Sequence, residues 1–366
     1  MSQGPNGGPN GGPDRVPDRG MDGGADGGVA AFVAALPKVE LHLHLVGSAS
    51  PQTVLALARR HPDGGVPTEP EALREFYAFT SFPHFLEVYA RVNLLVRTGA
   101  DVVTLLDGLA TQLAASRVRY AEVQVTAVRN RMAGIGYDDL AQALADGRER
   151  ALAQQGVELA WIFDADGALG PAGAAETVAF AVGHRPPGTV ALGLGGPEPG
   201  VRRADFGPAF RRAREAGLHS APHAGETGDP GEIWSALSDL EAERIGHGIA
   251  AASDPALLEH LARERITLEV CPTSNVCTGV VPSLAEHPLP ALLAAGVPVS
   301  LATDDPGMFH TDMNREYQLG HDQFGLGPAQ LADLARAGAQ AAFCSDATRQ
   351  AILTEIDQLM SRTARS

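Results

Sequence analysis

The 366-residue sequence has few of the features that mark exported or membrane proteins. It contains three cysteines, Cys271, Cys277 and Cys344, and so sparse and odd a set argues against a disulfide framework and indicates a reducing compartment. No run of eighteen apolar residues without charge occurs, and the N-terminus lacks the charged-then-apolar layout of a secretory signal. We therefore expect a cytoplasmic protein that neither spans a membrane nor is exported.

Basic residues are also scarce. The chain has 28 Lys and Arg against 44 Asp and Glu, which gives a formal net charge of −16. A predominantly negative surface repels a polyanion, so the composition argues against a nucleic-acid polymer as partner. Lysine is almost absent, because Lys38 is the single one in the chain. The sequence carries no signal of oligomeric state.

Residues 1–28 differ in composition from the rest of the chain. They hold ten glycines, four prolines and no apolar run, so they cannot bury enough surface to offset chain entropy. We predict a disordered tail there. The whole chain is 44% hydrophobic, which is enough to fill the core of one large domain at residues 29–366.

After Val29, short β-branched runs alternate with Ala-, Leu- and Arg-rich stretches of helical periodicity. Eight segments are typical of buried strands: 38–45, 118–125, 157–164, 189–196, 218–225, 243–248, 266–272 and 297–304. Eight strands joined by helical segments predict an α/β fold, a closed (β/α)8 TIM-type barrel of parallel strands. An open doubly wound sheet is the alternative, but its Gly-x-Gly-x-x-Gly turn after the first strand is missing. The helical interval at about 48–117 is predicted to be a cap inserted after strand 1.

Polar residues stand at the carboxyl ends of four predicted strands, the face that is catalytic in such barrels. His42 and His44, two apart on the first strand, share one face and point into the barrel. The stretches HAGE (223–226), GHG (246–248) and TDDP (303–306) end three later strands. One buried histidine is usually an ordinary core residue, but here coincidence would have to repeat on four strands.

The residue types at this face suit a divalent metal. Neutral imidazoles with a carboxylate are ligands that zinc prefers, and a catalytic site keeps one position for water. Four side chains can supply the ligands: His42, His44, His223 and Asp304. A bound metal lowers the pKa of its water towards roughly 7, which provides a nucleophile at neutral pH. Glu226 and His247 are then left to transfer protons.

Five motifs resemble, in content and order, those of the metal-dependent adenosine deaminase family within the amidohydrolase superfamily: PKVELHLHL, HAGE, RIGHG, EVCPTSN and SLATDDP. The resemblance extends over residues 37 to about 350. It implies a zinc-dependent hydrolase that removes the 6-amino group of a purine nucleoside as ammonia. It also implies one zinc ion per chain, held by the four ligands named above.

The resemblance implies roles for individual residues. Glu226 matches the residue that delivers a proton to purine N1 as water adds to C6, and His247 matches the histidine that orients or deprotonates this water. Asp305 matches the carboxylate that binds purine N7, and Gly196 matches the glycine whose N–H meets N3. Protonation of the ring must accompany the addition, because charge would otherwise accumulate on the purine.

Three positions depart from the family pattern. Val46 stands where the family usually has an acidic residue, which in the nucleoside enzymes accepts a hydrogen bond from the ribose 5′-hydroxyl. Pro197 stands in place of an aspartate, and Gln124 in place of an arginine. We interpret Val46 as a contact to a substrate without a 5′-hydroxyl, since a carboxylate would be poorly solvated there. The alternative interpretation is that all three differences are neutral substitutions of residues that do not contact the substrate.

One branch of the family is similar to this pattern. It deaminates aminodeoxyfutalosine, an adenine nucleoside of menaquinone biosynthesis whose 5′ carbon continues into a keto-linked carboxyphenyl group. The substrate carboxylate needs a cation near the barrel mouth, and Arg91, Arg97 and Arg129 are candidates.

Other functions stay open from the sequence alone. An adenosine deaminase of purine salvage and a noncatalytic purine-binding relative are alternatives, although neither a ligand nor Glu226 is lost. A two-metal hydrolase with a bridging lysine is disfavoured, because no lysine follows Lys38.

Overall fold

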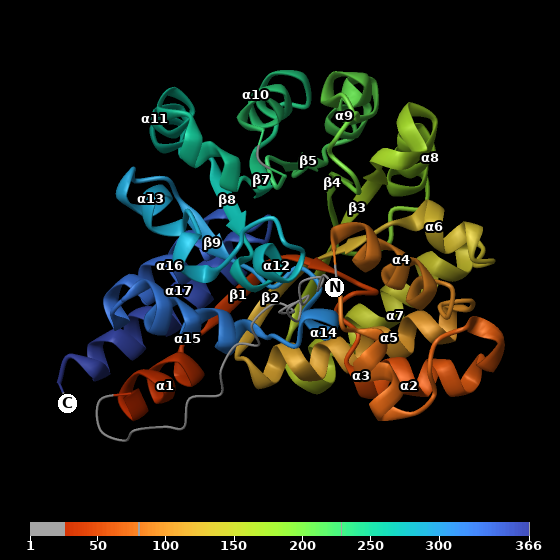
Figure 1. Ribbon diagram of the computed structural model, residues 1–366, viewed down its shortest axis with the longest axis horizontal. Coiled ribbons are helices and arrows are strands. Elements are labelled where there is room, and N and C mark those ends of the chain that lie inside the picture. The colour runs from red at the N-terminus through yellow and green to blue at the C-terminus, as the bar shows by residue number, and fades with distance from the viewer. Residues whose placement is uncertain (1–25, 80, 228, 366) are drawn as a thin grey trace, which may run out of the picture.

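The computed structural model describes residues 26–79, 81–227 and 229–365 (Figure 1). Most of the tail predicted at residues 1–28 therefore lies outside the described residues. Helix α1 (Asp26–Ala35) already begins three residues before the predicted start of the domain. No helix in the described ranges combines the length and the apolar character needed to cross a bilayer.

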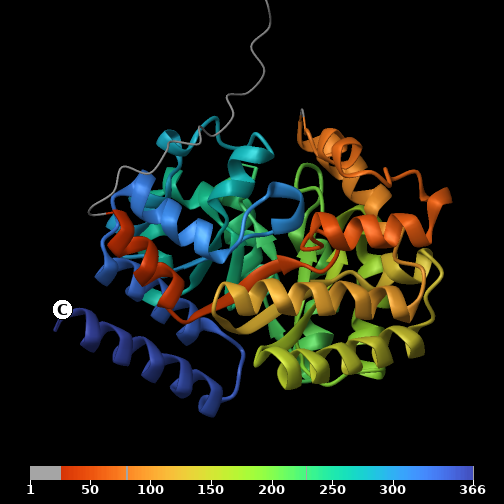
Figure 2. The same ribbon diagram turned by 90° about the horizontal axis from the view of Figure 1, so that it is seen from below.

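Parallel strands form the centre of the molecule, and helices surround them (Figures 1 and 2). One sheet has the order β1-β2-β3-β4-β5 and the other the order β6-β7-β8-β9. The strands are β1 (Lys38–His44), β2 (Val118–Val125), β3 (Glu158–Asp166), β4 (Thr189–Gly195), β5 (His219–Ser220), β6 (His223–Ala224), β7 (Arg244–His247), β8 (Thr267–Val270) and β9 (Val299–Leu301).

The two sheets are parts of one closed barrel. β5 and β6 are the two halves of the strand predicted at 218–225; β5 pairs with β4 and β6 with β7. Pro222 separates the halves, because proline has no N–H to donate to a ladder. The first and last strands meet at the seam of the barrel. There the His44 N–H donates to the Asp304 carbonyl and the Asp304 N–H donates to the His42 carbonyl, each at an N–O distance of 2.9 Å. This closure confirms the predicted barrel and excludes the open sheet.

Helices connect the strands and cover the outside of the barrel. Those after β2 are α6 (Ala127–Met132), α7 (Tyr137–Gln155), α8 (Gly170–Gly183), α9 (Gly207–Glu215), α10 (Pro230–Asp239), α11 (Pro255–Glu264), α12 (Pro272–Cys277), α13 (Leu289–Ala294), α14 (Pro306–Phe309), α15 (Met313–Phe324), α16 (Pro328–Ala341) and α17 (Asp346–Thr363). Short 3₁₀ turns are η1 (Pro62–Gly64), η2 (Gly167–Leu169), η3 (Arg203–Phe206), η4 (Ile249–Ser253) and η5 (Leu284–Glu286). Many of these helices begin with proline, whose missing N–H costs nothing in a first turn.

The region predicted as a cap, residues 48–117, contains two different parts. Helices α2 (Pro51–Arg60), α3 (Pro70–Phe76) and α4 (Phe82–Asn93) form the cap, and α4 borders the cavity described below. Helix α5 (Gly99–Ala115) instead packs along α7 and β2 in the outer ring (Figure 2). Gly147 permits this approach, because an added Cβ would lie 2.3 Å from Cδ1 of Leu106. Within the interval predicted as a cap, α5 therefore covers the barrel, whereas α4 borders the cavity.

Strand β1 shows how the sequence pattern positions polar groups inside the barrel. Val39, Leu41 and Leu43 are fully buried on the face towards the helices, α16 among them. Glu40 and His42 alternate with them and point inward, where Glu40 accepts hydrogen bonds from Thr303 and His42 contacts Glu269. The two-residue period of a strand therefore places the apolar side chains in the core between strand and helices and the polar side chains inside the barrel.

Candidate active site

A cavity of about 510 Å³ opens at the carboxyl ends of the strands, between the barrel, α4 and α6. Its volume lies in the range of about 300–1,000 Å³ that is typical of small-molecule sites. Nine residues singled out from the sequence line it: His44, Val46, Arg129, Gly196, His223, Glu226, His247, Asp304 and Asp305. The departures Gln124 and Pro197 line it as well. His42 lies beneath these residues and is fully buried.

The four side chains predicted as metal ligands lie close together on the cavity floor. Nε2 of His44 lies 3.3 Å from Oδ1 of Asp304 and 3.3 Å from Nε2 of His223, and Nε2 of His42 lies 3.6 Å from the same Oδ1. Ligand atoms of a tetrahedral zinc site with bonds of about 2.0 Å are separated by roughly 3.3 Å. Among the described residues, the buried Nε2 of His42 has no hydrogen-bond partner. These residues therefore fit a metal ion.

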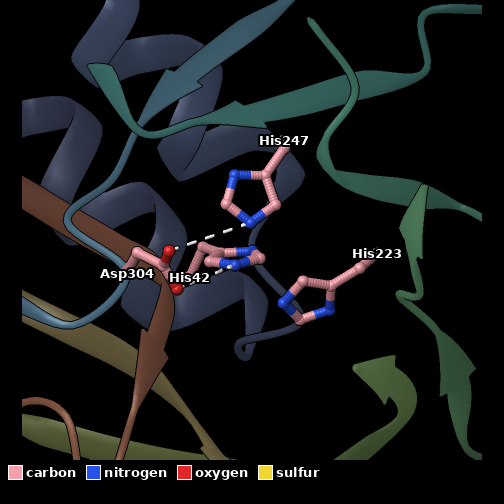
Figure 3. Close-up of side chains that lie close together, drawn as sticks. All are labelled: His42, His223, His247 and Asp304. Atoms are coloured by element: carbon pink, nitrogen blue, oxygen red, sulfur yellow. Dashed lines mark ion pairs between the residues drawn. The ribbon is translucent and has the colours of Figure 1, made fainter. Parts of the chain in front are cut away.

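His247 also lies beside this cluster (Figure 3). Two groups of candidate ligand atoms lie within 4.8 Å of one another: one comes from His42, His223, His247 and Asp304, and the other from His44, Asp304 and Asp305. The two oxygens of Asp304 face different partners. Oδ1 faces His42 and His44, whereas Oδ2 lies 3.9 Å from Nε2 of His247 and accepts a 2.7 Å hydrogen bond from Ser274. This division supports His44 as the ligand and leaves His247 beside the metal position.

A carboxylate behind the cluster orients the ring of His42. Nδ1 of His42 lies 2.8 Å from Glu269, whose other oxygen accepts a 2.6 Å hydrogen bond from Arg244. This contact fixes the tautomer that leaves Nε2 of His42 free for a metal. Nδ1 of His44 faces Asp164 at 3.6 Å. Glu269, Arg244 and Asp164 were not predicted, although charged residues at inward positions of strands were a signal available in the sequence.

The backbone at the site adopts conformations that non-glycine residues rarely have. Asp304 has a φ of +63° and His247 a φ of +57°, and left-handed residues of this kind cluster at functional sites. Gly47 accommodates the carboxyl group of Asp305, because a Cβ at Gly47 would lie 1.5 Å from Oδ1 of Asp305. The glycine that follows Val46 therefore permits the approach of the residue predicted to bind purine N7.

Burial sets the protonation of the groups predicted to move protons. Burial, followed by the negative charge of Asp304, raises the pKa of Glu226 to about 8, so this carboxyl holds a proton at neutral pH. Burial, followed by the charge of His42, lowers the pKa of His247 to about 3 and keeps this ring neutral. Burial and Asp304 also raise the pKa of Asp305 well above its usual value. A protonated Asp305 could donate to purine N7, which is an acceptor.

A buried ion pair ties together the loops that carry Gly196 and Glu226. Glu198 accepts a 2.9 Å hydrogen bond from Arg203 through one oxygen. Its other oxygen accepts from the N–H and the hydroxyl of Thr227, each over 2.8 Å. The residue next to Glu226 is thereby fixed to the loop after β4.

The three arginines predicted to meet a substrate carboxylate lie in different places. Arg129 lines the cavity and contacts Asp166 at 2.6 Å. Arg91 pairs with Glu87 at 2.8 Å and Arg97 with Asp63 at 2.9 Å, and neither is among the residues that line the cavity. Of the three, Arg129 is therefore the one positioned at the site.

Comparisons with known proteins agree with this geometry. The model of the adenosine deaminase family matches residues 37–359. The chain is 50% identical to an aminodeoxyfutalosine deaminase of Streptomyces coelicolor over 89% of this chain and 85% of that protein. It is 36% identical to an adenine deaminase of Rhizobium leguminosarum bv. trifolii over 88% of this chain and 99% of that protein.

Solved structures show the same architecture. An adenine deaminase from Arthrobacter aurescens has a TM-score of 0.85 and 30% identity, with 89% of this chain and 99% of that one covered. An amidohydrolase from Burkholderia ambifaria, solved with bound zinc, also has a TM-score of 0.85, at 27% identity and with 95% and 98% covered.

Proposed function

This chain belongs to the adenosine deaminase family, and we propose that it deaminates aminodeoxyfutalosine hydrolytically. The observation that carries the choice of substrate is Val46. This side chain is 5% exposed, lines the cavity two residues after His44 and can accept no hydrogen bond. A nucleoside whose 5′ carbon bears an apolar extension fits beside valine, whereas a 5′-hydroxyl would lose its partner there. The Streptomyces coelicolor relative, which is 50% identical to this chain, supports the same substrate.

We propose that one zinc ion per chain is the cofactor. His42, His44, His223 and Asp304 would hold it, since their ligand atoms converge and the buried Nε2 of His42 lacks a hydrogen-bond partner in the described structure. A zinc ion at this position would supply an activated water as nucleophile. The relative solved with bound zinc supports the choice of metal.

The remaining residues bind the purine and move protons. Glu226, protonated in its buried setting, gives a proton to N1 as the water oxygen bonds to C6. Neutral His247 lies 3.8 Å from Glu226 and can take the proton of the attacking water. Asp305 donates to N7 and the N–H of Gly196 donates to N3. His247 then gives its proton to the amino group and the C6 hydroxyl gives its proton to Glu226, so that the C6–N bond breaks, ammonia leaves, and a 6-oxopurine remains.

Metal analysis tests the ligand assignment. Purified His42→Ala and Asp304→Ala proteins should contain much less zinc than the wild type, because each substitution removes one of four ligands. Glu226→Gln is the matched control and should keep its zinc, since Glu226 is not a predicted ligand. Full zinc retention in both ligand variants would overturn the assignment.

A substitution at Val46 tests the choice of substrate. Val46→Asp should lower kcat/KM for aminodeoxyfutalosine and raise it, from a low base, for adenosine. An unpaired or repelled carboxylate typically costs about 1–3 kcal/mol, or roughly 5- to 150-fold in specificity. Val46→Leu serves as the control, because it changes size without polarity. Equal changes for both substrates in the aspartate variant would argue against Val46 as a specificity residue.

A further inference from the structure

The cavity mouth exposes two large apolar side chains. In the described ranges, the large apolar residues with high exposure are Leu94, Met132, Leu152 and Trp234. Leu94 is 53% exposed and directly follows α4, while Met132 is 64% exposed and is the last residue of α6. Both line the cavity, although 37 residues separate them in the chain. Single exposed apolar residues are normal, but two from separate elements at one cavity indicate a binding surface.

Further apolar residues line the same cavity as these two side chains. Val46 lies at its inner end beside His44. Half-buried Leu86 and Ala133 also line it. Residues of both α4 and α6 line this cavity. A ligand that extends outward past Val46 therefore has apolar side chains of both elements available to contact.

We infer that Leu94 and Met132 form a subsite for the aromatic ring at the 5′ end of the substrate. The inference rests on the proposed function, which supplies a substrate with a ring at that end. A ring covered by Leu94 and Met132 would remove their exposed apolar surface from water.

A charged group stands at the edge of the same subsite. Arg129 precedes Met132 by three residues on α6, so the two side chains share one face of the helix. A ring that packs on Met132 would present a carboxylate substituent to Arg129. The guanidinium has five N–H donors, more than its partner Asp166 can occupy. Apolar contact and charge therefore act on adjacent parts of one substituent.

Two substrates distinguish the effect of the ring contact on turnover from effects on the rest of the site. Aminodeoxyfutalosine carries the ring, whereas 5′-deoxyadenosine has the same adenine and ribose, no 5′-hydroxyl and no ring. Leu94→Asn and Met132→Gln replace apolar side chains by neutral polar ones of similar size, so they add no charge that could repel the carboxylate. Leu152→Asn is the matched control, because Leu152 is 50% exposed on α7 and does not line the cavity.

The variant that carries both Leu94→Asn and Met132→Gln should have a higher KM for aminodeoxyfutalosine and a kcat/KM lower by about tenfold or more. Its kcat/KM for 5′-deoxyadenosine should fall much less. Leu152→Asn should not change the ratio between the two substrates. An equal loss for both substrates, or the same loss in the Leu152 variant, would overturn the subsite. A wild-type protein that deaminated 5′-deoxyadenosine but not aminodeoxyfutalosine would instead contradict the proposed function, and the subsite with it.

Discussion

Neighbouring carboxyl groups in this site carry different charges because their partners differ. Burial alone would raise the pKa of Asp304, but the imidazole rings of His42 and His44, at 3.6 and 3.3 Å from its Oδ1, hold this pKa well below its usual value. For Glu226, the negative charge of Asp304 adds to the effect of burial, and its pKa rises to about 8. Their surroundings, and not their residue types, therefore make Asp304 a carboxylate suited to bind a metal and Glu226 an acid suited to deliver a proton.

Replacement of the acid should separate chemistry from folding. Glu226→Gln should keep the fold and the zinc but lower kcat by roughly 100- to 10,000-fold, because the amide cannot deliver a proton to N1. Steady-state kinetics with a parallel zinc measurement checks this. Near-normal turnover in the variant would show that another group delivers the proton.

A second buried acid makes stability depend on pH. Burial raises the pKa of Glu40 to about 8, although hydrogen bonds from Thr303 act in the opposite direction. The folded protein therefore holds a proton that the unfolded chain releases above its ordinary pKa of 4.5. This contribution to stability is fully present below pH 4.5 and is lost as pH rises through 8.

Glu40→Gln should remove this dependence. The variant should have a Tm several degrees above that of the wild type at pH 9, whereas the difference at pH 5 should be small, since each unit of pKa shift is worth about 1.4 kcal/mol. Thermal unfolding of both proteins at the two pH values measures it. An equal difference at both would contradict a protonated Glu40.

At the scale of elements, the loops after β4 and β6 work as a pair. One carries Gly196 and the other Glu226, and Glu198 connects them through Thr227. Arg203, which is 3% exposed, holds Glu198 in place and also donates to the carbonyl of His223. The acid expected at N1 and the N–H expected at N3 of the purine therefore have one common support.

Glu198→Gln should weaken this support. A neutral amide loses the charge-assisted part of the hydrogen bonds, and we expect kcat to fall by about tenfold with an unchanged zinc content. Glu232→Gln is the matched control, because Glu232 also faces Arg203, at 3.4 Å, but is not tied to Thr227. The same loss in both variants would show that the effect comes from Arg203 and not from the link between the loops.

Sequence patterns predicted the order of the strands and helices, but not where a strand is broken or where a helix packs. The strand expected at 218–225 is split at Pro222, and the predicted cap included α5, which belongs to the outer ring. Both differences depend on packing between distant segments, such as the approach of Leu106 to Gly147, which local periodicity does not encode.

The same limit applies to the site. The residues at the ends of β1, β6, β7 and β9 were predicted, because parallel strands bring their carboxyl ends together. Glu269 and Asp164 were missed, since only the closed barrel shows which inward charges meet His42 and His44. The apolar mouth was also missed, because Leu94 and Met132 come from elements that meet only in the folded chain.

At the scale of the whole molecule, the proposed metal would join distant parts of the chain. His42 and His44 come from the first strand, whereas Asp304 follows the last strand and pairs with both across the seam of the barrel. His223 comes from the middle of the sequence, at the second half of the split strand. A metal at this position would link the two sheets and the seam.

Removal of the metal should therefore destabilise the entire barrel. A ligand at 1,000 times its Kd stabilises a protein by about 4 kcal/mol, so chelation should lower Tm by several degrees. Added zinc should restore it. The Asp304→Ala protein serves as the control, because its Tm should not respond to zinc. A Tm that chelation leaves unchanged in the wild type would contradict a metal that spans the seam.

Turnover by the wild-type protein tests the central claim most directly. Loss of absorbance near the adenine maximum should be followed with aminodeoxyfutalosine, adenosine and adenine under identical conditions. We predict the highest kcat/KM for aminodeoxyfutalosine, because Val46 offers apolar contact where a 5′-hydroxyl would need an acceptor. Faster turnover of adenosine than of aminodeoxyfutalosine would contradict the account and would identify an ordinary adenosine deaminase.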